Sequence, residues 1–139
     1  MNEIKLSLDY RKLLKKPNSI LTAEISLSIG KSPKLLSRNE IKNFALDVSC
    51  NGRTFSPATF KDRRRCKSSF EQQQLFVMDF DNNEQNECVS FEGVCKRAER
   101  YELPILFAYE TLSSMEQNKF RVIFLNDVSI TDRKVAEAN

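Results

Sequence analysis

The chain has 139 residues, a formal net charge of +3 and 40% apolar residues, so we expect a single domain, residues 1–139, with one core. It contains no histidine, which excludes Ser-His-Asp and Cys-His catalysis and every His-ligated zinc or haem site within the chain. No apolar run reaches the roughly 20 residues of a spanning helix, and the first residues lack a secretory signal. We therefore expect a cytoplasmic location and no membrane partner.

The first part of the chain, residues 1–50, is predicted to form an N-terminal β-α-β extension. Alternating apolar residues predict strands over 4–8 and 20–29. Ser37 and Glu40 have the spacing of a capping box, and the apolar residues that follow predict an amphipathic helix over 38–50. Residues 54–60 are expected to be extended.

Residues 51–139 are expected to form the main part of the domain. We predict strands over 75–79, 105–110 and 119–125, a helix over 90–102, a loop over 127–130 and the start of a helix at 131. This β-α-β-β-α order indicates an α+β fold of the ferredoxin-like or RRM-like kind whose last strand is missing. We therefore expect an incomplete domain whose sequence is interrupted at its end.

Charge is distributed unevenly along the chain. Residues 1–70 hold 15 Lys and Arg against 6 Asp and Glu, whereas residues 71–139 hold 7 against 13. This asymmetry favours a polyanionic partner together with a cation or carboxylate site, and chance clustering on a solvated surface is the alternative. Four cysteines, none in a Cys-x-x-Cys motif, are expected to be reduced thiols (Cys50, Cys66, Cys88 and Cys95).

The most basic stretch of the chain is residues 61–67. Five of its seven residues are cations: Lys61, Arg63, Arg64, Arg65 and Lys67. Clusters of this kind bind phosphate backbones with little sequence preference, so we expect this loop to contact a nucleic-acid template. Three phenylalanines flank it (Phe55, Phe60 and Phe70). They could stack on the bases of a single strand, but we favour the interpretation that they are core residues. A solvated loop is the alternative.

Two carboxylates follow the apolar run 75–78. Asp79 and Asp81 are separated by one residue, so they project on the same side of an extended chain. Hard cations such as Mg²⁺ or Mn²⁺ are the natural partners of such a pair. An ordinary acidic turn and a haloacid-dehalogenase-like phosphatase are the alternatives. An EF-hand is excluded because Glu84 and Ser90 stand where it needs glycine and glutamate.

Several stretches together resemble a known family. They are 52–60 (GRTFSPATF), 73–81 (QQLFVMDFD), 90–92 (SFE), 103–104 (LP), 109–114 (YETLSS) and 119–125 (KFRVIFL). From about residue 50 to 139, the chain is similar to the N-terminal part of primase-polymerases of the archaeo-eukaryotic primase superfamily, of the kind found on bacterial plasmids, phages and integrated elements.

The resemblance implies a nucleotidyltransferase acting in replication of a mobile element. Asp79 and Asp81 match the motif that binds catalytic Mg²⁺ or Mn²⁺. The residues expected to position the triphosphate are Ser113, Ser114, Lys119 and Arg121. Single-stranded DNA template, nucleoside triphosphates and a helicase or other replication protein are the implied partners, with Arg63, Arg64, Arg65 and Lys67 on the template.

The chain departs from the family pattern at two places. The histidine of the second motif is absent, and no aspartate is assigned to the third motif, since Asp127 and Asp132 come early for it. A site without its third carboxylate is expected to bind metal poorly. The chain is therefore expected to be a truncated product, a fragment or a degenerate relative. A non-catalytic nucleic-acid-binding module is the alternative function.

Overall fold

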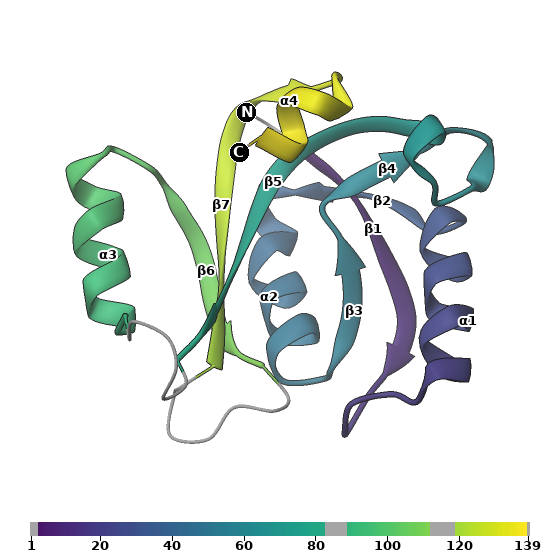
Figure 1. Ribbon diagram of the computed structural model, residues 1–139, viewed down its shortest axis with the longest axis horizontal. Helices are drawn as coiled ribbons and strands as arrows, with labels where there is room; N and C mark the ends of the chain where they lie inside the picture. Colours follow the sequence, from purple (N-terminus) through teal and green to yellow (C-terminus); the bar gives the residue numbers. More distant parts are fainter. Residues whose placement is uncertain (1–2, 83–88, 112–118, 139) are drawn as a thin grey trace.

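The computed structural model describes residues 3–82, 89–111 and 119–138, and it confirms an α+β fold (Figure 1). The strands are β1 (Glu3–Lys12), β2 (Pro33–Ser37), β3 (Arg53–Ser56), β4 (Ala58–Phe60), β5 (Phe70–Asp81), β6 (Ile105–Glu110) and β7 (Lys119–Ile130). The α-helices are α1 (Ser19–Gly30), α2 (Ile41–Ser49), α3 (Phe91–Arg100) and α4 (Arg133–Ala138). Three short 3₁₀ turns are η1 (Arg38–Glu40), η2 (Lys61–Arg63) and η3 (Lys67–Ser69).

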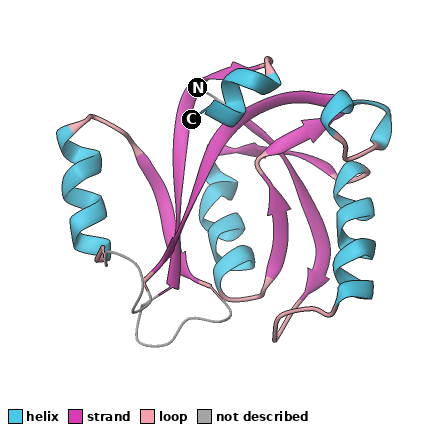
Figure 2. Cartoon of the chain, viewed as in Figure 1, coloured by secondary structure: helices cyan, strands magenta, loops and turns pink. Residues whose placement is uncertain are grey.

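The strands form two antiparallel sheets (Figure 2). The first sheet has the order β2-β1-β3 and the second has the order β4-β5-β7-β6. The chain passes from one sheet to the other at Pro57, between β3 and β4. Both β5 and β6 run antiparallel to β7, so the β5-α3-β6 segment is a split β-α-β unit with β7 between its strands. The predicted β-α-β-β-α order over the second half is therefore present.

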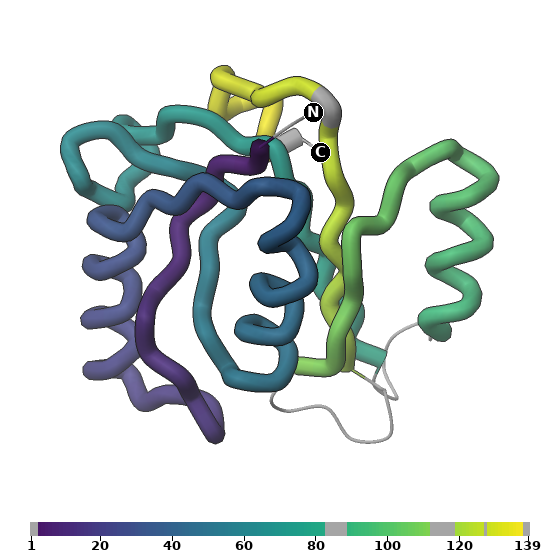
Figure 3. The backbone as a smooth tube through the Cα atoms, turned by 180° about the vertical axis from the view of Figure 1, so that it is seen from behind, coloured from purple at the N-terminus to yellow at the C-terminus, as the bar shows by residue number. Residues whose placement is uncertain are grey.

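One hydrophobic core lies between the sheets. Its buried residues come from β1, β2, α2, β5 and β7 (Ile4, Leu6, Leu8, Leu36, Phe44, Val48, Leu75 and Ile123). Helix α2 contacts both β3 and β6, so it bridges the two sheets, as the view from behind shows (Figure 3). The opposite face of the second sheet packs against α3 through Val94, Phe120 and Val122. The second sheet therefore has one face toward α2 and the other toward α3.

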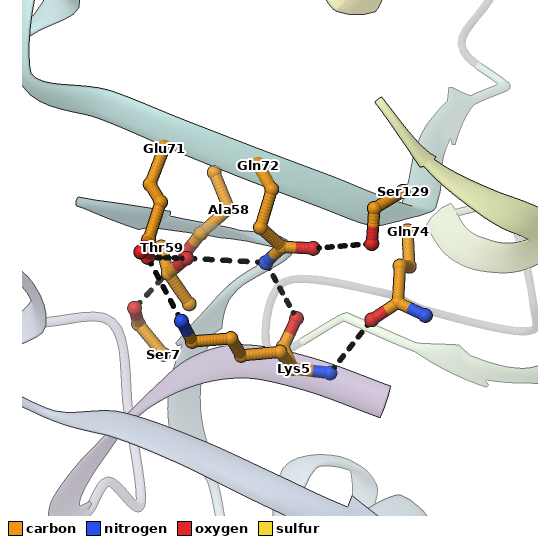
Figure 4. A network of polar contacts seen from close by, with 8 residues as sticks. All are labelled: Lys5, Ser7, Ala58, Thr59, Glu71, Gln72, Gln74 and Ser129. Atoms are coloured by element: carbon orange, nitrogen blue, oxygen red, sulfur yellow. Dashed lines mark hydrogen bonds and ion pairs between the residues drawn. The ribbon is translucent and has the colours of Figure 1, made fainter. Parts of the chain in front are cut away.

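A polar network joins β1 to β4 and β5 (Figure 4). Gln72 Nε2 donates to the carbonyl of Lys5 and to Thr59 Oγ1, each at 3.1 Å. Thr59 Oγ1 donates to Glu71 Oε2 at 2.6 Å, and Lys5 Nζ lies 3.1 Å from the same carboxylate oxygen. Gln74 Oε1 accepts from the Lys5 amide at 2.9 Å. These contacts fix the position of one sheet relative to the other.

The segment over 20–29 corrects the sequence prediction, because it is helix α1 and not a strand. The alternation that suggested a strand includes Leu27, which is 71% exposed, while Ile25 and Ile29 are buried four residues apart. That spacing is one helical turn. Asn18 caps the helix by accepting from the amide of Leu21 at 2.8 Å. The N-terminal extension therefore has one helix more than predicted.

Other predicted elements agree more closely with the structure. The helix expected over 38–50 is present as η1 and α2, and the amide of Ser37 donates to Glu40 Oε1 at 3.1 Å. Ser90 caps α3 by accepting from the amide of Gly93. The loop expected over 127–130 is wrong, since β7 continues to Ile130. None of the helices in the described part of the chain is long and apolar enough to cross a bilayer.

Candidate functional site

A cleft of about 500 Å³ opens between the two sheets. One wall comes from the ends of β5 and β6 and the start of β7, and the other comes from the turn after β1 and the start of β3. Four of the residues predicted to act together line it: Asp79, Asp81, Lys119 and Arg121. The structure thus gathers the predicted metal ligands and two of the predicted phosphate-binding residues in one place.

The acidic pair lies where β5 leaves the core. Leu75 and Val77 pack in the core between the sheets, and β5 residues two apart share a face. Asp79 and Asp81 continue that face beyond the core, and both are exposed. The packing of Leu75 and Val77 thus orients β5. The next two residues on the same face, Asp79 and Asp81, therefore present their carboxylates to the cleft.

Strand pairing sets each carboxylate opposite a cation. Asp79 pairs with Arg121, and Asp81 pairs with Lys119, in the antiparallel register of β5 and β7. Arg121 Nε donates to Asp79 Oδ1 at 2.5 Å, and Arg121 Nη1 donates to the hydroxyl of Tyr109 on β6 at 3.0 Å. The arginine predicted to bind phosphate therefore bridges the acidic pair and β6.

The surroundings of Arg121 and Tyr109 keep the arginine charged and the tyrosine neutral at neutral pH. Burial alone would lower the pKa of Arg121, but the hydrogen bond with Asp79 and the contact with Tyr109 raise it on balance. Burial raises the pKa of Tyr109, against the opposing effect of Arg121. At neutral pH the cleft therefore presents a permanent guanidinium beside a protonated phenol.

The opposite wall contributes a second arginine. Arg53 Nε donates to the carbonyl of Asp9 at 2.9 Å, and Arg53 Nη1 lies 3.1 Å from Asp47 Oδ2. Its side chain is only 19% exposed, so the guanidinium is held in place at the cleft. Arg53 belongs to the 52–60 stretch that carries the family resemblance, but it was not among the predicted site residues. Arg53 contacts residues of β1 and α2, so no pattern among its neighbours in the sequence predicts these contacts.

A glycine allows the second wall to close on the cleft. Gly52 has φ +66°, and a Cβ there would lie 1.9 Å from the carbonyl oxygen of Leu13. The amide of Leu13 donates to the carbonyl of Gly52 at 3.1 Å. Only glycine permits this approach, which holds the turn that carries Lys16 at the rim of the cleft.

The acidic pair could bind a metal ion whose other ligands are water molecules and phosphate oxygens. Among the described residues no group of three or more His, Cys, Asp or Glu side chains is close enough to hold an ion. Two carboxylates on one strand face match Mg²⁺ or Mn²⁺ that keeps its waters and takes further oxygens from a phosphate. Arg121 donates to the Oδ1 oxygen of Asp79, so the other carboxylate oxygen is the one that could bind a metal beside the arginine.

Two groups of predicted residues are not in the described cleft. Ser113 and Ser114 lie outside the described residues, although Thr111 and Lys119, on either side of that segment, both line the cleft. Arg63, Arg64, Arg65 and Lys67 lie just before β5, at the end opposite Asp81. A strand of 12 residues spans up to about 40 Å, so the structure does not bring these cations to the acidic pair.

Comparison with known proteins adds no relative. No family model, no curated protein and no solved structure matches this chain.

Proposed function

We propose that the cleft between the sheets binds a nucleoside triphosphate with Mg²⁺ or Mn²⁺, as the nucleotide site of a primase-polymerase-like domain from a mobile element. The observation that carries this proposal is the register that places Asp79 and Asp81 directly beside Arg121 and Lys119 in one cleft. A metal–triphosphate complex requires carboxylates that bind the metal and, next to them, cations that bind the phosphates.

Each residue has a role that follows from its position. Asp79 and Asp81 would hold the metal, which neutralises triphosphate charge and activates the attacking hydroxyl. Lys119 and Arg121 would bind phosphate oxygens, and Arg121 is oriented for this by Tyr109. In nucleotidyl transfer a primer hydroxyl attacks the α-phosphorus, and the bond to pyrophosphate breaks. This chain's contribution is to position the triphosphate and to compensate its charge.

The second candidate is a nucleic-acid-binding module without catalysis. It is favoured by the ion pair between Arg121 and Asp79 and by the missing third carboxylate among the described residues. In that case Arg121 stays with Asp79, and the cleft binds phosphate without a metal. Dependence on metal therefore separates the two functions.

Isothermal titration calorimetry of a nucleoside triphosphate, with Mn²⁺ or with EDTA, tests the proposal. We expect binding to the unaltered chain that requires Mn²⁺ and disappears in the Asp79→Ala/Asp81→Ala variant. Asp132→Ala is the matched control, because Asp132 precedes α4 and does not line the cleft. Binding that persists in EDTA would favour the non-catalytic module, and the absence of binding under both conditions would overturn the proposal.

A further inference from the structure

The basic segment, Lys61 with Arg63, Arg64, Arg65 and Lys67, is a concentrated positive surface. All five residues are exposed. Within residues 3–82, 89–111 and 119–138, none of the five forms an ion pair, and Lys61 interacts with the Glu71 carboxylate only at longer range. Like charges this close repel one another, and a polyanion relieves that repulsion.

The backbone of the basic segment is held in a defined shape. Asp62 and Arg63 both have left-handed conformations, with φ of 56° and 54°, which non-glycine residues seldom adopt. The segment packs on the end of α1 at Gly30, where a Cβ would lie 2.6 Å from the amide nitrogen of Arg65. Arg65 Nη1 also donates to Ser26 on α1, at 3.4 Å. The cations are therefore presented on a fixed turn beside α1.

A second cleft, of about 340 Å³, lies beside this segment. Phe60 and Phe70, from β4 and β5, line it together with Arg65 and Lys67 and with an ion pair between Arg133 and Glu137. Both rings are partly exposed, and the buried residues Ala58 and Ala136 also contribute to its lining. Aromatic faces next to cations can stack a base and bind its phosphate.

We propose that the basic segment and the second cleft bind single-stranded nucleic acid, with phosphates along the basic segment and one base against Phe60 or Phe70. Stacking on these rings needs a base whose face is open, which a duplex does not offer. An acidic peptide would satisfy the cations and leave the aromatic rings unused. This site lies at the far end of β5 from Asp79, so it does not rest on the proposed nucleotide site.

Fluorescence anisotropy with a labelled 20-mer oligothymidine, in EDTA, tests this inference on the full chain. The Arg63→Gln/Arg64→Gln/Lys67→Gln variant is compared with Lys34→Gln/Lys42→Gln/Lys96→Gln, which removes the same charge from exposed positions elsewhere. Only the first variant is expected to weaken binding, and the slope of log K against log salt should fall by about two. Phe60→Leu/Phe70→Leu, which removes both candidate stacking rings, should weaken binding about tenfold. Thermal melts establish that each variant is folded.

Several outcomes separate this site from the alternatives. Equal loss in both triple variants would overturn the inference. Equally tight binding of a duplex would overturn the assignment to single strands, and equally tight binding of polyglutamate would point to an acidic protein instead.

Discussion

Arg121 shows how one side chain connects three strands at the candidate site. It donates to Asp79 on β5 and to Tyr109 on β6 from its own place on β7, and its guanidinium lies 5.8 Å from the centre of the Tyr109 ring. The ion pair with Asp79 is largely exposed, so it contributes little to stability. In the proposed nucleotide site, the guanidinium that pairs with the Asp79 carboxylate in this structure would bind a phosphate of the nucleotide.

Replacing Arg121 should therefore have opposite effects on metal and on nucleotide. In Arg121→Gln we expect Mn²⁺ alone to bind more tightly, because Asp79 loses a competing cation. Affinity for the metal–triphosphate complex should fall about tenfold, since a charge-assisted hydrogen bond is lost. Electron paramagnetic resonance of free Mn²⁺ and calorimetry measure the two affinities. Equal changes in the same direction would contradict this role. Arg100→Gln, at an exposed position at the end of α3 and outside both clefts, serves as the control.

Cys66 is a second residue whose surroundings change its chemistry. Ser68 Oγ and Ser69 Oγ lie 3.3 and 3.1 Å from its sulfur, and these hydroxyls, together with Arg64, lower the thiol pKa from 9.0 to about 7. Its thiolate fraction should therefore rise with pH through about 7. We expect the rate of alkylation by iodoacetamide, followed by mass spectrometry, to have its midpoint there. In Ser68→Ala/Ser69→Ala the midpoint should move toward 9, and an unchanged midpoint would contradict the assignment.

At the scale of elements, the packing between β1, β4 and β5 determines where the two walls of the cleft stand. Thr59 is fully buried at this junction and both donates to Glu71 and accepts from Gln72. A hydrogen bond from Thr59 is the main reason that the pKa of Glu71 is lowered, with Lys5 adding to the effect. Glu71 therefore adds stability above its unfolded pKa, and this contribution is lost as the pH falls through the lower folded pKa.

Thr59→Val tests the network at nearly constant side-chain volume. The free energy of unfolding should fall by about 1–3 kcal/mol, because one buried and one partly buried hydrogen bond lose their common partner. Urea denaturation at pH 7 measures the change. Ser129→Ala removes an exposed member that donates only to Gln72, and it should change stability by less than about 0.5 kcal/mol. Similar effects of both substitutions would show that the buried network does not hold the sheets.

Gly52 tests the close approach of the turn after β1. Gly52→Ala places a Cβ against the carbonyl of Leu13 and demands a left-handed alanine, so we expect a loss of more than about 1 kcal/mol in the free energy of unfolding. Nucleotide affinity should fall as well, since the turn forms part of the cleft wall. Gly93→Ala, within α3, is the comparison and should change stability by no more than about 1 kcal/mol. A neutral Gly52→Ala would contradict the packing at this turn.

At the scale of the whole molecule, the sequence predicted the second half better than the first. Strands β5 and β7 carry strong apolar runs, which predict them as strands, and the structure adds that their charged ends pair with each other. Helix α1 was missed because apolar residues at 25 and 29 satisfy both a strand and a helix period. Arg53 and Lys16 could not be found locally, because packing of the first sheet against the second brings them to the cleft.

The same packing separates two kinds of charge. The acidic pair and the basic segment are close in sequence, but β5 extends between them and directs one toward the cleft and the other toward α1. We propose two separate sites at opposite ends of β5, one for a metal–nucleotide complex and the other for a single strand.

Nuclear magnetic resonance with Mn²⁺ tests the central claim, that both sheets form the nucleotide site, most directly. Bound Mn²⁺ broadens nearby amide signals, and the effect falls steeply with distance. With a nucleoside triphosphate and Mn²⁺, compared with Mg²⁺, we expect broadening at 79–81 and 119–121 and across the cleft at 52–55, with residues 61–67 unaffected. Broadening that spares 52–55, or that appears first at 61–67, would contradict the account.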